Sequence, residues 1–147
     1  MKPNIIFFTN PLIQHTKRIY ENYYQSLFLN LKYFFNLTVV DRDCDFTQEL
    51  DKNCPDIILF DGGQDIIEKP INIKNLRGNQ HIPKIGLIQV DSHHPSKFRT
   101  LKQFDEYDIK TYFAIDTSIG QAMPEINERL YYLPWHVDSS IYCNYNL

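Results

Sequence analysis

The chain has 147 residues, the length of one ordinary domain, and a net charge of −3. Hydrophobic residues make up 43% and charged residues 22%, which is typical of a globular protein and excludes a disordered chain. No block of Lys and Arg stands out, so we expect no nucleic-acid partner. Three scattered cysteines cannot form a disulfide framework, which favours a reducing compartment.

The first half of the chain alternates apolar runs with a helical pattern. The run "NIIFF" at residues 4–8 predicts a strand that is buried on both faces. Apolar residues then recur every four positions, which predicts a long amphipathic helix over residues 13–35. The β-branched stretch "LTVVD" at 37–41 predicts a second strand, and "FTQELDKN" predicts a weak helix.

The second half continues this alternation. "PDIILFDGG" and "PKIGLIQV" predict two buried strands, separated by an irregular segment with at most one short helix. A short helix over 95–104 and the strand "KTYFAID" follow. "TSIGQAMPEINERL" then predicts a helix, with Thr117 or Ser118 as N-cap and a kink or late start at Pro124. "LYYLPWHVD" ends the pattern with a short strand.

Strands that alternate with helices predict an α/β fold. We expect a single Rossmann-like domain over residues 1–147, with a mostly parallel sheet of about five or six strands and helices on both faces. None of the apolar segments is long enough for a signal peptide or a membrane span, so a cytoplasmic protein is the default expectation. Peripheral contact with a membrane and a homodimer stay open.

The candidate site comprises the polar residues that follow the strands, because ligands of open parallel sheets bind at the carboxyl ends of the strands. We expect a binding or catalytic role for Asn10, Asp61, Gly62, Gly63, Asp91, Ser92, His93 and His94. The two histidines are the sharpest feature, since imidazole exchanges protons near neutral pH and hydrogen-bonds phosphates or hydroxyls.

Each of these residues also has a structural interpretation. The histidines can be ordinary loop residues, Asp91 can cap a turn rather than orient an imidazole, and Asp61–Gly63 can form a simple turn. Two adjacent histidines do not easily reach one ion and no distant cluster completes a site, so we expect no metal. Glycine-rich dinucleotide and P-loop motifs are absent from the sequence, so we expect no bound cofactor.

The ordered set "PDIILFDGG", "IPKIGLIQVDSHH", "YFAIDTSIGQAMPE" and "LYYLPWHVDSSIY" resembles the N-terminal domain of GT-B glycosyltransferases. The similarity is to the family-4-like kind with spore-maturation-type N-terminal domains. The family's Pro-x-x-Val-Asp-x-x-x-Phe/Tyr pattern matches Pro134, Val137, Asp138 and Tyr142, with Trp135 and His136 in place of the usual Asn-Gly. His93 or His94 matches a histidine that the family carries after a middle strand.

The resemblance implies half of a GT-B fold, the acceptor-side half of an enzyme that transfers a sugar from a nucleotide-sugar donor. A missing C-terminal domain would hold most of the donor, so the domain alone is expected to be inactive. A split gene, a shortened chain and a domain reused alone stay open. Where many relatives have a Gly-Gly loop after the first strand, this chain has "TNPLIQH", which weakens the case for close phosphate contact there.

Two non-catalytic alternatives remain. A receiver-like regulatory module would place its phosphoacceptor at Asp61, although the chain lacks an acidic pair after the first strand and a Lys after the fifth. A stand-alone interaction domain would have kept the fold and lost the chemistry.

Overall fold

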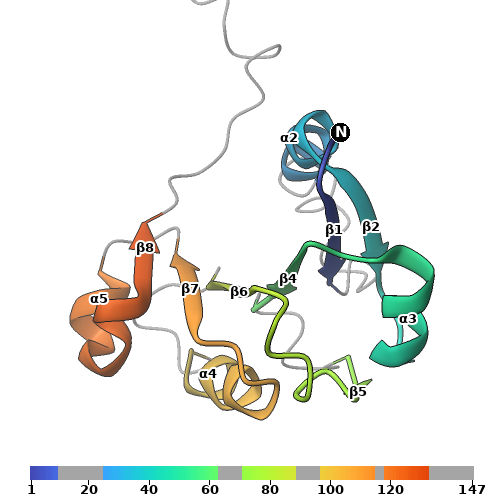
Figure 1. The fold of residues 1–147 in the computed structure, drawn as a ribbon. Helices are drawn as coiled ribbons and strands as arrows, with labels where there is room; N and C mark the ends of the chain where they lie inside the picture. The colour runs from blue at the N-terminus through green and yellow to red at the C-terminus, as the bar shows by residue number, and fades with distance from the viewer. Residues whose placement is uncertain (10–24, 63–70, 89–96, 115–117, 133–147) are drawn as a thin grey trace, which may run out of the picture.

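The computed structural model describes residues 1–9, 25–62, 71–88, 97–114 and 118–132 (Figure 1). The described chain forms an α/β fold around a six-stranded sheet in which every neighbouring pair of strands is parallel. The strands lie in the order β2-β1-β4-β6-β7-β8. They are β1 (Asn4–Phe8), β2 (Asn36–Val40), β4 (Ile57–Asp61), β6 (Lys84–Ile88), β7 (Thr111–Ala114) and β8 (Leu130–Tyr132).

Helices cover both faces of this sheet, as the sequence predicts (Figure 1). Helix α2 (Gln25–Phe34) packs on one face, and α3 (Phe46–Asn53), α4 (Lys97–Glu106) and α5 (Ile119–Ala122) pack on the other. Because successive side chains of a strand point to opposite faces, β1, which has a neighbouring strand on each side, contributes to both layers. Its alternating residues are almost entirely buried, which explains why its sequence is apolar throughout.

Aromatic rings join the helices to the sheet. On one face, the ring of Phe7 meets the ring of Phe28 in α2 edge-to-face, with centroids 5.6 Å apart. On the other face, the neighbouring Phe8 contacts Phe46 of α3 at 6.2 Å. Phe104 of α4 packs edge-on against Phe60 of β4 at 5.7 Å. Such pairs add specific geometry to the burial of large apolar surfaces, so they fix where each helix sits.

Local signals set the ends of α3. Asp45 is the N-cap, and its carboxylate accepts a hydrogen bond from the backbone N–H of Thr47 at 2.9 Å. At the other end Cys54 adopts the left-handed conformation, with φ 42°, and its N–H donates to the carbonyl of Leu50 at 2.8 Å. These two caps explain why a helix of only eight residues is stable here, as the sequence predicts.

A second, two-stranded sheet was not predicted. It pairs β3 (Cys44–Asp45) with β5 (Ile73–Lys74), and both strands have only two residues. Tyr107, just after α4, anchors β5. Its hydroxyl accepts from the N–H of Ile73 at 3.1 Å and donates to the carbonyl of Ile71 at 2.8 Å. The segment that was expected to be irregular is therefore held in place by a side chain from a distant part of the sequence.

The structure bears on three expectations about helices. The stretch expected as one helix near the C-terminal end is two elements, α5 and the 3-10 helix η4 (Pro124–Arg129). Pro124 lacks a backbone N–H and begins η4, so it ends the first helix and starts the next. No helix lies within residues 71–81, and residues 64–70, the rest of the segment for which at most one short helix was expected, lie outside the described residues. The long helix expected over 13–35 is confirmed as α2 from Gln25 onward, and its first half lies outside the described residues.

Candidate functional site

The strand order defines where a ligand site belongs. After β1 the chain places β2 on one side of it, and β4 then pairs with the opposite side of β1. The boundary between β1 and β4 is therefore the topological switch point, where the connections leave in opposite directions. Ligands of open parallel sheets bind at the carboxyl ends of the strands beside such a point. Residues 9 and 61–62 lie at those ends.

A buried pair of polar side chains occupies the switch point. The hydroxyl of Thr9 donates to a carboxylate oxygen of Asp61 over 2.7 Å, across a sequence separation of 52 residues. Thr9 is fully buried and Asp61 exposes only 1% of its surface. A buried polar side chain is costly to leave without hydrogen-bond partners. The pair therefore ties the end of β1 to the end of β4.

The backbone at the same edge is held as well. The N–H of Thr9 donates to the carbonyl of Val40 at 3.1 Å, which carries the β1–β2 ladder past the end of β1. The N–H of Gly62 donates to the carbonyl of Leu87 at 2.8 Å and extends the β4–β6 pairing in the same way. The backbone at residues 9 and 62 is therefore fixed at this edge of the sheet.

This arrangement suits positioning rather than proton transfer. In the described conformation Asp61 acts as an acceptor that orients Thr9, and Gly62 brings a backbone without a side chain to the edge of the sheet. Within the described residues the edge offers no acid–base pair of its own. Proton transfer at this edge would therefore need side chains outside the described residues, such as the predicted His93 and His94.

Of the eight residues predicted for the site, the structure describes Asp61 and Gly62 and brings both to the switch point. The remaining six lie outside the described residues: Asn10, Gly63, Asp91, Ser92, His93 and His94. The segment that carries the last four follows β6, which pairs with β4 and so belongs to the same region of the sheet. Thr9 was not predicted. Its signal was its position, directly after the first strand and before the predicted Asn10.

No metal centre is evident in the described part of the chain, where no group of three or more His, Cys, Asp or Glu side chains is placed to hold an ion. The two described cysteines, Cys44 and Cys54, are free thiols. Burial, followed by the negative charge of Glu49, raises the pKa of Cys44 to about 11. Cys44 is therefore protonated at neutral pH and is poorly suited to act as a nucleophile or metal ligand.

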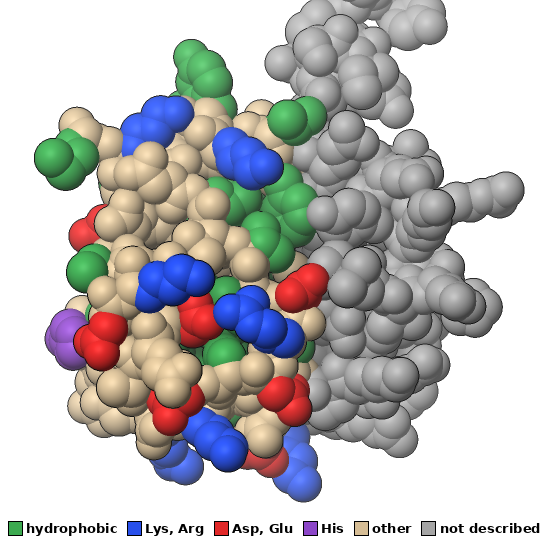
Figure 2. Space-filling model, turned by 90° about the vertical axis from the view of Figure 1, so that its right-hand side faces the viewer, with side chains coloured by type: hydrophobic (Ala, Val, Ile, Leu, Met, Phe, Trp, Pro, Cys, Tyr) green, Lys and Arg blue, Asp and Glu red, His purple; other side chains and the backbone are tan. Residues whose placement is uncertain are grey.

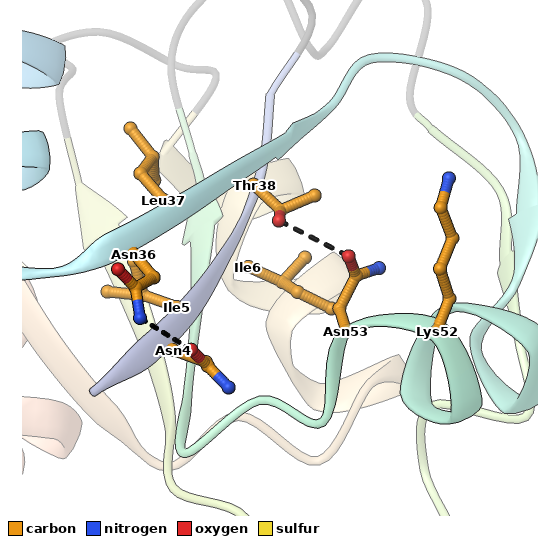
Figure 3. Close-up of a pocket in the computed structure, with 8 residues that line it drawn as sticks. All are labelled: Asn4, Ile5, Ile6, Asn36, Leu37, Thr38, Lys52 and Asn53. Atoms are coloured by element: carbon orange, nitrogen blue, oxygen red, sulfur yellow. Dashed lines mark hydrogen bonds between the residues drawn. The ribbon is translucent and has the colours of Figure 1, made fainter. Parts of the chain in front are cut away.

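A pocket of about 270 Å³ lies at the opposite, amino-terminal end of β1 and β2, beside the last turn of α3 (Figure 3). Its lining is rich in amides and was not predicted. The eight residues around it are Asn4, Ile5, Ile6, Asn36, Leu37, Thr38, Lys52 and Asn53.

The polar side chains of this pocket bond to one another and to neighbouring groups outside the lining. Asn36 donates to the side-chain oxygen of Asn4 at 3.0 Å, and Thr38 donates to the side-chain oxygen of Asn53 at 3.3 Å (Figure 3). Asn53 in turn donates to the carboxylate of the buried Glu49 at 3.0 Å, which also accepts from Arg42 at 2.9 Å. These bonds join β1, β2 and α3, so the pocket has a clear structural role. The switch point remains the better candidate for a ligand site.

Comparison with known proteins gives no match: no family model, no curated protein and no solved structure matches this chain. None of the helices in the described ranges is both long enough and apolar enough to cross a bilayer.

Proposed function

We propose that this chain is the acceptor-side, N-terminal-type domain of a glycosyltransferase that transfers a sugar from a nucleotide-sugar donor to a hydroxyl. The observation that carries the proposal is the parallel sheet with its switch point between β1 and β4, where the buried Thr9–Asp61 pair fixes the strand ends. The motifs that resemble GT-B N-terminal domains supply the reaction class, and they follow the same strands in the chain.

In this proposal the loops at the carboxyl edge form one wall of the reaction cleft. Asp61 and Gly62 set the edge, and the neighbouring Asn10 and Gly63 line it. Asp91 and Ser92 contact substrate, and His93 or His94 contacts the donor phosphates, the sugar or the acceptor hydroxyl. A second nucleotide-binding domain completes the cleft, because a single wall neither excludes water nor orients two substrates. We expect weak binding and no turnover from this domain alone.

NMR chemical-shift perturbation tests the proposal. The full chain is titrated with UDP, GDP, their sugar conjugates and free saccharides, and the backbone amides of Thr9 and Gly62 report on the edge of the sheet. The amides of Asn4 and Asn36, at the opposite end of the same strands, are the internal control. We expect shifts at Thr9 and Gly62 with at least one sugar nucleotide, none at the control amides, and loss of the shifts in His93→Ala or His94→Ala.

The competing interpretation is a stand-alone interaction or regulatory domain without catalysis. Burial of Asp61 speaks against its use as a phosphoacceptor, since a phosphodonor has to reach the carboxylate. An interaction domain would give a well-dispersed spectrum that no nucleotide, sugar nucleotide or saccharide changes. That result, in a folded chain, would favour the interaction domain over the proposed transferase.

A further inference from the structure

The outer face of α2 exposes large apolar side chains that the core does not need. Leu29 and Tyr33, four residues apart on the same row of the helix, are 51% and 73% exposed, and Phe34 beside them is 61% exposed. The inner face of the same helix already supplies Leu27 and Phe28 to the sheet, where both are buried. Leu29, Tyr33 and Phe34 belong to neither of the two hydrophobic clusters that pack the helices on the sheet.

Two lysines accompany these apolar side chains. The ammonium of Lys2 donates to the carbonyl of Lys32 at 3.0 Å and lies 5.9 Å from the centre of the Tyr33 ring. Residues 1–4 and 25–36 contain these two lysines and no Asp or Glu. Figure 2 shows hydrophobic side chains standing out at the top of the molecule, with basic side chains between them and, among the described side chains there, no acidic one.

We propose that the outer face of α2, formed by Leu29, Tyr33 and Phe34 with Lys2 and Lys32, docks on a bilayer surface that contains anionic lipids. Tyrosine and phenylalanine bury an apolar ring at the level of the headgroups, and lysines beside them pair with lipid phosphates and carboxylates. The charge supports this partner. The whole chain carries −3, whereas this face carries two positive charges, so an anionic surface attracts this end and repels the rest.

Co-sedimentation of the full chain with lipid vesicles tests the inference. Vesicles of phosphatidylcholine with phosphatidylserine are compared with vesicles of phosphatidylcholine alone. We expect clear binding to the anionic vesicles, weaker binding to the neutral ones, and loss of the difference at high salt. Replacing Lys2 or Lys32 by Gln weakens binding to the anionic vesicles by about fivefold for each lysine. Tyr33→Ser with Phe34→Ser weakens it by at least about tenfold.

A matched control comes from β8, the edge strand on the far side of the sheet from β2. Tyr131 and Tyr132 in β8 are each 55% exposed, so Tyr131→Ser with Tyr132→Ser removes comparable surface aromatics away from α2. Unchanged vesicle binding by this control supports the inference. Equal binding to neutral and anionic vesicles would overturn it, as would equal loss of binding in the control. Sedimentation velocity tests the alternative that a second copy of the chain covers this face. A dimer that the α2 substitutions dissociate would assign the face to that second copy and overturn the inference. The reporter amides of the nucleotide titration, Thr9 and Gly62, lie at the carboxyl ends of β1 and β4, whereas Lys2 precedes β1 and Lys32 lies in the last turn of α2, so failure of either proposal leaves the other standing.

Discussion

Gly86, in the middle of β6, is the position where the smallest substitution should have a large effect. A Cβ atom built there would lie 2.4 Å from Cε2 of Phe104, 2.6 Å from Cζ and 2.8 Å from Cδ2. Carbon atoms pack best at roughly 3.5–4.0 Å, so the ring would have to withdraw by about 1 Å. The ring has little room, since it stacks on Tyr112 with centroids 5.7 Å apart and meets Phe60 edge-on at 5.7 Å.

The expected cost of Gly86→Ala follows from these contacts. Overpacking a dense core costs about 1–3 kcal/mol, and a fully buried, doubly packed ring places this site toward the upper end. Alanine also restricts the unfolded chain, which offsets about 0.4–1 kcal/mol. We therefore expect a net loss of about 2 kcal/mol in the free energy of unfolding, and a thermal midpoint lower by roughly 4–8 °C.

Urea unfolding followed by far-UV circular dichroism measures this loss, and Gly78→Ala is the matched control. A Cβ at Gly78 meets nothing within 4 Å, and neither glycine has a positive φ, so the control should be neutral or slightly stabilising. Phe104→Leu removes the ring atoms that clash, so Gly86→Ala should cost less in that background by at least about 1 kcal/mol. Equal stability of the two glycine variants, or the same cost in both backgrounds, would refute the reasoning.

Three further predictions concern hydrogen bonds and a thiol. Thr9→Val keeps the shape of the side chain but removes the donor to buried Asp61, so it should lower the free energy of unfolding by about 1.5–3 kcal/mol in urea titrations. Thr9→Ser, which keeps the hydroxyl, should cost less. A Val variant as stable as the parent chain would show that the bond is unimportant. Tyr107→Phe removes both hydrogen bonds from the Tyr107 hydroxyl to the backbone at β5 and should lower the free energy of unfolding by about 1–3 kcal/mol. Hydrogen exchange in residues 71–74 should become faster, and unchanged exchange would contradict the anchoring role. Because the pKa of Cys44 is raised in the folded chain to about 11, its thiol supports folding fully below about pH 9, and that support is lost as the pH rises toward 11. Cys44→Ala should therefore flatten part of the alkaline loss of stability. Peptide mapping after iodoacetamide treatment at neutral pH should find the exposed Cys54 modified well before the partly buried Cys44; equal rates would argue against a protected, protonated thiol at Cys44.

Local patterns in the sequence determined the elements of this protein. The apolar run at residues 4–8 gives β1 with the predicted bounds, and "FTQELDKN" gives α3 with the predicted bounds. Strand and helix signals of this kind depend on neighbours a few positions away, so they can be read before the fold is known. Pro124 acts equally locally, and the predicted kink or late start appears as the break between α5 and η4.

The site was determined by the sequence only in part. Asp61 and Gly62 were predicted because a parallel sheet gathers the carboxyl ends of its strands at one edge. That rule does not say which strands are neighbours. The sequence places β2 directly after β1, and only the assembled sheet shows that β4 occupies the other side of β1 and that Thr9 meets Asp61.

Only the tertiary structure decided the contacts between distant segments. The pairing of β3 with β5 involves two residues on each strand, too few to form a periodic pattern. The need for glycine at position 86 comes from the Phe104 ring of another element, and the amide-lined pocket comes from the starts of two strands and the end of a helix. The exposure of Tyr33 and Phe34 was likewise invisible in an apolar helix pattern. Propensity and periodicity are properties of a short stretch of chain, whereas strand order, burial and side-chain partners depend on how the whole chain packs.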